Sequence, residues 1–167
     1  MVKWAVIVGV AMVGLVGLVA LVGVFLPKAH RESRTTEFAV APSVVFDTIA
    51  GFARASEWRP DVTQVDVLPD DGRGRVIREH TGQGVVPYRV EVYEPPTRLV
   101  MRIDDHSLPY AGAWIYELHP EGAGTRLTIT EEGEVFDPVF RVMQKFFFSP
   151  YATIDRYVEA LHKRLHA

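Results

Sequence analysis

Hydrophobic and polar residues follow three patterns along this chain, and the first is an unbroken apolar run. It extends from Trp4 to Leu26, 23 residues without a charge. At about 1.5 Å per residue, a helix of this length reaches across the roughly 30 Å hydrocarbon core of a bilayer. A cleaved signal peptide is the alternative, but the run is long for one and "LPKAHRES" lacks a convincing cleavage site. We therefore predict an uncleaved transmembrane anchor over residues 1–27.

The charges that flank this run bear on its orientation. Its N-terminal side carries Lys3, whereas its C-terminal side carries Lys28, Arg31 and Arg34, partly offset by Glu32. Lys and Arg are enriched on the cytoplasmic side of membrane helices. The chain is therefore predicted to be a single-pass membrane protein whose C-terminal domain is cytoplasmic.

The second pattern is an alternation of apolar and polar residues, which begins after a polar linker at residues 28–33. Tyr88, Val90 and Val92 share one face of such a segment, while Arg89 and Glu91 take the other. Strands with one apolar and one polar face are typical of an antiparallel sheet covered on one side. Gly- and Pro-containing turns separate the segments. The predicted strands are "SRTTEFAV", "TQVDVLP", "RVIREHTG", "VPYRVEVYE", "RLVMRIDD", "GAWIYELHP" and "TRLTITEEGE".

The third pattern is helical spacing, which occurs after the first strand and again at the end of the chain. "APSVVFDTIAGFARASEW" predicts a helix with proline near its first turn. Asp137 and Pro138 begin a second helix with a broad apolar stripe, which Pro150 must break or kink, with Ser149 placed to cap a further segment. One strand, a helix, six strands and a long bent helix predict an α+β domain over residues 34–167.

Composition and charge exclude several functions. The chain has no cysteine, so disulfides, thiolate nucleophiles and Cys-ligated zinc are excluded. A net charge of −3 gives no reason to expect nucleic acid as a partner. "GQGVVP" lacks the glycine spacing of a nucleotide loop and opens a strand, so we expect no cofactor.

Two stretches resemble a known superfamily. "TEFAVAPSVVFDTIAGFARASEWRPDV" is similar to the opening strand, proline-bearing helix and tryptophan-containing second helix of the START-like superfamily, also called SRPBCC, the polyketide cyclase/dehydratase and lipid-transport group. "GTRLTITEEGEVFDPVFRVMQKFFF" is similar to its last strand and C-terminal helix. The resemblance covers residues 34–167 and implies a helix-grip fold, in which a seven-stranded antiparallel sheet wraps around the C-terminal helix with a cavity between them. Because the superfamily contains carriers, cyclases and coenzyme Q-binding proteins, it does not assign chemistry.

Apolar side chains on the predicted inner faces, with Phe and Met from the last helix, are the expected walls of this cavity. A membrane anchor would hold such a lipophile-binding cup beside the phase in which its ligand dissolves. The predicted ligand-binding residues are Tyr88, Val90, Met101, Trp114, Tyr116, Ile129, Phe140, Met143 and Phe147.

Acidic residues are the main candidates for catalysis. If Leu127 and Ile129 face inward, alternation places Glu131 on the same face, and Glu79 shares a face with Ile77. Carboxylates in an apolar cup have raised pKa values and can act as general acids or bases. Their positions near strand ends favour the alternative that both are solvated or paired with arginine.

Histidines give weaker candidates. His106 could stand at the cavity mouth and form an acid–base pair with Asp105. His162 and His166 have the spacing of a zinc-chelating pair, but no carboxylates accompany them and their position suits a helix C-terminus. We therefore expect no metal site.

Three functions remain open. The first is a membrane-anchored domain that binds a hydrophobic small molecule or lipid. The second is an enzyme of the cyclase/dehydratase type, in which Glu131, Glu79 or His106 points into the cavity. The third is a protein-interaction module with a vestigial pocket.

Overall fold

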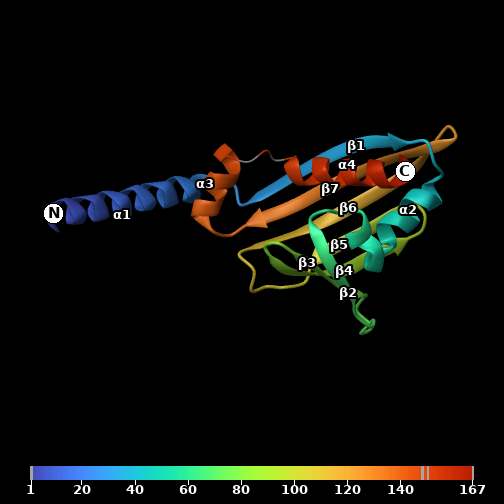
Figure 1. The fold of residues 1–167 in the computed structure, drawn as a ribbon, viewed down its shortest axis with the longest axis horizontal. Helices are drawn as coiled ribbons and strands as arrows, with labels where there is room; N and C mark the ends of the chain where they lie inside the picture. Colours follow the sequence, from blue (N-terminus) through green and yellow to red (C-terminus); the bar gives the residue numbers. More distant parts are fainter. Residues whose placement is uncertain (1, 148, 150, 167) are drawn as a thin grey trace.

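A seven-stranded antiparallel sheet forms the body of the protein in the computed structural model, which describes residues 2–147, 149 and 151–166 (Figure 1). The strand order is β1-β7-β6-β5-β4-β3-β2, so β2–β7 form a meander and β1 pairs with β7. The strands are β1 (Ala29–Phe38), β2 (Val62–Val67), β3 (Val76–Thr81), β4 (Gly84–Glu94), β5 (Arg98–Ile103), β6 (Tyr110–Glu121) and β7 (Gly124–Val135). The predicted α+β helix-grip architecture is thus confirmed for the sheet and the C-terminal helix that it holds.

The prediction of a polar linker at residues 28–33 requires a correction, because most of this segment belongs to a strand. Strand β1 begins at Ala29, and its first residue pairs with Glu134 of β7. Polar residues that looked like a connector therefore form an edge strand, where charged side chains are common because one edge faces solvent.

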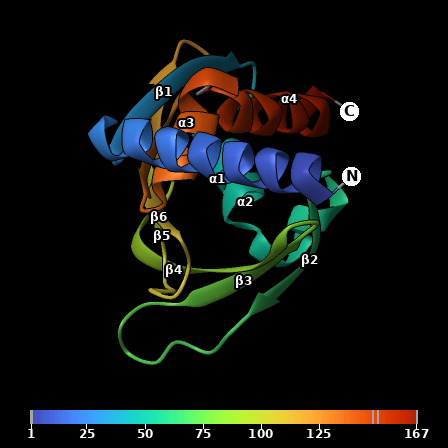
Figure 2. The same ribbon diagram turned by 90° about the vertical axis from the view of Figure 1, so that its left-hand side faces the viewer.

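Among the described residues, four α-helices and one 3-10 helix complete the fold. They are α1 (Val2–Phe25), α2 (Pro42–Ala50), the 3-10 helix η1 (Phe52–Glu57), α3 (Pro138–Phe147) and α4 (Ala152–His166). Helices α2 and α4 lie on the concave side of the curved sheet (Figure 2). The first turn of α2 contains Pro42, as its pattern predicted.

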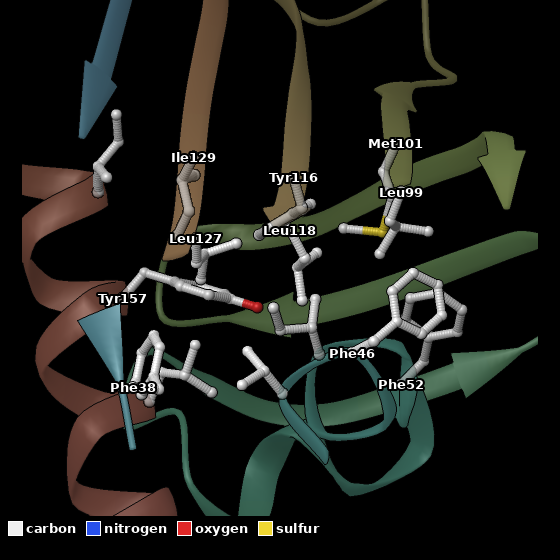
Figure 3. Packing of buried hydrophobic residues seen from close by; sticks show 14 of the residues in the cluster. Phe38, Phe46, Phe52, Leu99, Met101, Tyr116, Leu118, Leu127, Ile129 and Tyr157 are labelled. Carbon is white, nitrogen blue, oxygen red and sulfur yellow. The ribbon is translucent and has the colours of Figure 1, made fainter. Parts of the chain in front are cut away.

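The hydrophobic core lies between the concave face of the sheet and helices α2 and α4. Alternate residues of the strands point inward, so Leu127 and Ile129 of β7 and Leu118 of β6 are fully buried. They belong to one core cluster with Ile154 and Tyr157 of α4, and Figure 3 shows Tyr157 beside Leu127. The spacing of two residues in strands thus predicted the core face correctly.

The long bent helix predicted at the end of the chain is two separate helices, α3 and α4. Asp137 caps α3, since its Oδ1 accepts hydrogen bonds from the backbone N–H groups of Val139 and Phe140 at 2.8 and 2.9 Å. Ser149 precedes α4 and accepts a bond from the backbone N–H of Tyr151 at 3.3 Å. Pro150, the predicted breaker, lies outside the described residues. Helix α4 covers the sheet, whereas α3 packs against the end of α1 (Figure 1).

Helix α1 extends away from the sheet as a single straight element (Figure 1). Within the residues that the structure describes, which leave out several side chains of α1, no helix is long and apolar enough to cross a membrane. The transmembrane character of residues 1–27 is therefore not confirmed and stays a prediction.

Candidate functional site

Three side chains on the inner face of the sheet lie beyond the part that α4 closes. They are Tyr88 of β4, Trp114 of β6 and Glu131 of β7, and each is half-buried. Trp114 lies opposite Glu131 in the β6–β7 register and opposite Met101 in the β5–β6 register. Trp114 lies in the first half of β6 and Glu131 in the second half of β7, and these halves lie on the side of the sheet toward α3 and α1 (Figure 1). We call these three residues the inner-face cluster.

An aromatic layer, to which Trp114 of this cluster belongs, connects the cluster with the closed core. The ring of Tyr157, on α4, lies 5.8 Å from that of Trp114 and 5.6 Å from that of Tyr116, measured between centroids. Trp58 packs edge-on against Tyr157 at 5.2 Å. Tilted and edge-on aromatic contacts at these distances are favourable, so these rings hold one another in place beneath the inner-face cluster.

A buried ion pair borders the same face. Arg59 donates to Glu79 Oε1 at 2.6 Å and to Asp61 Oδ2 at 2.7 Å, and the Arg59 and Glu79 side chains are only 12% and 6% exposed. Burial opposes the charge of Arg59, but these carboxylates outweigh it, so its pKa lies above its ordinary value. Burial and the charge of Glu79 likewise raise the pKa of Tyr88. Tyr88 therefore stays protonated and can donate a hydrogen bond.

Glu131 differs from Glu79 because no salt bridge to it is found among the described residues. Burial, with a smaller effect from the charge of Glu32, raises the pKa of Glu131 from 4.5 to about 7. Glu32 lies directly opposite Glu131 in the β1–β7 register. A carboxyl group with this pKa is poised to give or take a proton near neutral pH.

Replacing Glu131 with glutamine is expected to stabilise the fold at pH 8 by up to about 3 kcal/mol, because the variant cannot ionise. In the wild type, the folded-state pKa lies above the unfolded one, so stability falls as pH rises from 4.5 to about 7. Below pH 4 the two proteins should therefore unfold alike. Urea unfolding of both at several pH values measures the difference, and a difference independent of pH would contradict the raised pKa.

Four of the predicted ligand-binding residues belong to the closed core. Val90, Met101, Tyr116 and Ile129 are at most 8% exposed and pack within the core cluster. Where α4 covers the sheet, these side chains form part of the core, and Figure 3 shows Met101, Tyr116 and Ile129 within it. The residues of the inner-face cluster remain partly accessible.

The other three predicted ligand-binding residues require a correction. Phe140, Met143 and Phe147 are 63%, 40% and 71% exposed, and they lie on α3. They do not line the inner face, because α3 packs against α1 while α4 covers the sheet. Their position on one helix was predicted correctly. The prediction that this helix lines the inner face of the sheet was wrong.

His106 does not join the cluster. It is exposed in the loop between β5 and β6, and the Asp105 carboxylate instead accepts bonds from Ser107 N and Oγ at 2.8 and 2.7 Å. The expected Asp105–His106 pair is therefore not formed.

The histidines of α4 have a packing role. His162 Nε2 lies 2.8 Å from Thr36 Oγ1, and its ring stacks on Phe38. Among the residues with a described placement, no group of three or more His, Cys, Asp or Glu side chains could hold a metal ion.

Two surface depressions lie elsewhere, on the outer side of the sheet. One is lined by residues that include Arg31, Arg102 and Glu132, and the other by residues that include Arg78 and Arg89. Neither contains a residue of the inner-face cluster.

Sequence reasoning missed two residues at this site. Arg59 was not among the residues predicted from the sequence, yet it forms the buried pair with Glu79, 20 positions further along the chain. Tyr157 was not among them either, yet it contacts Trp58, Trp114 and Tyr116 in the aromatic layer. Neighbouring residues give no signal for Arg59, because its partner Glu79 lies on another element.

Comparisons with known proteins agree with this architecture. A family model described as "Polyketide cyclase / dehydrase and lipid transport" matches residues 29–165. No curated protein matches the chain.

Solved structures show the same fold at low identity. A START superfamily protein from Mycobacterium smegmatis is 19% identical, with 82% of this chain and 97% of that chain covered and a TM-score of 0.66. The Zhui aromatase/cyclase from Streptomyces sp. R1128 is 12% identical, with 83% of this chain and 94% of that chain covered and a TM-score of 0.67. Norcoclaurine synthase from Thalictrum flavum is 10% identical, with 83% of this chain and 87% of that chain covered and a TM-score of 0.63.

Proposed function

Because this chain belongs to the polyketide cyclase / dehydrase and lipid transport family, we propose that its domain binds a hydrophobic small molecule or lipid at the inner-face cluster. We propose further that α1 attaches the domain to a membrane, with the domain on the cytoplasmic side. The distribution of apolar surface over the molecule supports the binding and the attachment, and the excess of Lys and Arg after the apolar run supports the cytoplasmic side.

The observation that carries the binding proposal is the half-burial of Tyr88 and Trp114 on a face whose centre is closed by the core. Large aromatic side chains left accessible on a concave face are typical walls of small-molecule sites. The Tyr88 hydroxyl and the Glu131 carboxyl add polar groups that can orient a ligand. A lipophile with one polar group, such as a carbonyl or hydroxyl, fits this combination.

Support for membrane attachment comes from α1. Its described side chains are largely exposed, including Trp4, Leu15 and Phe25 at 73%, 60% and 82%. Such a continuous apolar surface on a helix without charges between Trp4 and Leu26 is stable only when something covers it. A bilayer would cover it and would place the inner-face cluster close to dissolved lipophiles.

Native mass spectrometry of the full chain released from detergent micelles tests ligand binding. The expected result is a reproducible added mass that solvent extraction identifies as a lipid or another lipophile. Tyr88→Ala should lower the retained fraction at least tenfold, because it removes most of one wall, a loss of more than about 1.4 kcal/mol.

Tyr93→Ala is the matched control, since Tyr93 lies on the same strand but is 52% exposed. It should retain the ligand as the wild type does. A clean unliganded mass, together with equal binding of a fluorescent fatty acid by both variants, would contradict the proposed site.

A second candidate function is acid–base catalysis, and the pKa of about 7 for Glu131 favours it. In that case Glu131→Gln would still retain the extracted ligand but would no longer convert it to product. Equal conversion by wild type and variant would remove Glu131 from this role.

A further inference from the structure

Helix α3 carries an apolar stripe that the domain leaves uncovered. Phe140, Met143 and Phe147 recur at the spacing of one helical face, and Phe146 beside them is 64% exposed. A short helix with its aromatic residues turned outward exposes apolar surface at a cost unless a partner covers it.

Helix α3 is joined tightly to the last turn of α1. Gly23 is buried there, and a Cβ atom added to it would overlap the Pro138 carbonyl at the start of α3. Because Gly23 lies two residues before the end of α1, α3 starts about 3 Å below that end along the helix axis. The depth of α3 is therefore set by the depth of α1.

Arg141 fastens this junction. Its guanidinium donates to the carbonyl oxygens of Gly23, Leu26, Val135 and Phe136 at 2.8, 3.3, 3.0 and 2.9 Å, and the residue is 6% exposed. The last carbonyls of a helix have no partner within it, and Arg141 binds that of Gly23 in α1 and that of Leu26 just beyond it. Because Arg141 occupies the face of α3 toward α1, the apolar stripe is turned to another side.

The charges of α3 suit one kind of surface. Residues 138–147 contain no acidic residue and expose the cation of Lys145, and Lys28 is exposed just after α1. Cationic side chains beside an apolar helical face favour the headgroups of anionic lipids.

We propose that α3 lies in the interface of the bilayer that α1 enters, with Phe140, Met143 and Phe147 among the acyl chains. This inference rests on the proposed membrane attachment of α1. Because α1 and α3 both contact the bilayer, the domain cannot rotate freely relative to the membrane surface. The strand ends that carry the inner-face cluster are thereby kept facing the membrane.

The test uses single-cysteine variants of the full chain, which has no cysteine of its own. Phe147→Cys, Val16→Cys and Glu159→Cys are labelled with a polarity-sensitive fluorophore and reconstituted into vesicles of phosphatidylcholine and phosphatidylglycerol. Lipids carrying a nitroxide near the headgroup or at the chain end act as depth-dependent quenchers. The Phe147 probe should be quenched best by the shallow nitroxide, because interfacial helices lie about 5–10 Å below the surface.

The other two probes separate the inference from the proposal on which it rests. Val16 lies within α1, and its probe should be quenched by the deep nitroxide. Glu159 lies on α4 with its side chain 66% exposed, and its probe should not be quenched. A quenched Val16 probe with an unquenched Phe147 probe would overturn the inference and leave the anchor intact. An unquenched Val16 probe would overturn both.

Other occupants of the stripe would give different results. A Phe147 probe that is shielded without quenching, in proportion to protein density in the vesicle, would indicate a second copy of this chain and overturn the inference. Shielding at every density would indicate that α3 folds back on its own sheet, which also overturns it.

The consequence for orientation has its own measurement. Energy transfer from a label at Glu159→Cys to labelled lipids reports how the domain stands above the bilayer. Phe140→Ser with Phe147→Ser should change this efficiency and leave quenching at Val16 unchanged. An unaltered efficiency would overturn the role of α3 in orientation.

Discussion

Replacing Arg59 with methionine is expected to lower the free energy of unfolding by about 3–5 kcal/mol, because it leaves the buried Glu79 carboxylate without its partner. The pair joins Arg59, just after η1, to β3, and its two side chains are 12% and 6% exposed. Methionine keeps the apolar stem of the side chain as far as the Nε position, so the loss reports mainly the missing guanidinium and its charge. Urea unfolding followed by tryptophan fluorescence measures it.

The double variant Arg59→Met with Glu79→Leu provides the control. Removing both charges leaves no unpaired buried group, so most of the lost stability should return. If Arg59→Met lowers the free energy of unfolding by less than about 1 kcal/mol, the Arg59–Glu79 pair is solvated in solution, which would contradict its burial.

Replacing Arg141 with alanine is expected to loosen the junction of α1, β7 and α3 by about 3 kcal/mol or more, since hydrogen bonds to a charged donor contribute about 1.5–3 kcal/mol each and add incompletely. Amide hydrogen exchange in residues 139–147 should then become at least about 100-fold faster, at about 1.4 kcal/mol per tenfold change. The effect should be confined to the junction, because the Arg141 contacts all lie there.

Lys145→Ala is the matched control on the same helix. Lys145 is an exposed cation with no hydrogen bond among the described residues, so exchange should stay as in the wild type. Equal exchange in wild type and Arg141→Ala would show that the backbone contact at Gly23 and Pro138 holds the junction without the arginine.

Much of the sheet could be predicted from the sequence because strand alternation is a local property. The side chains of Ile77 and Glu79 on β3, and of Ile129 and Glu131 on β7, were assigned to the inner face by their two-residue spacing, and they lie there. The Asp137 cap was predicted correctly for the same reason, since the cap and the amides that it binds are neighbours in the chain.

The candidate site was only partly predictable, because its contacts join distant residues. Arg59 reaches Glu79 on another element, and nothing in "SEWRP" records that contact. Tyr88, Trp114 and Glu131 could be placed on one face, but their accessibility depends on how far α4 extends over the sheet.

The sequence by itself determined the elements, their faces and the apolar character of α1 and α3, since each follows from the spacing of residues a few positions apart. Only the tertiary structure decided what those faces meet. The stripe of Phe140, Met143 and Phe147 has the same spacing whether it covers the sheet or faces away from it, so its periodicity could not choose between them. The separation of α3 from α4 and the grip of Arg141 on Gly23, 118 residues away, made that choice.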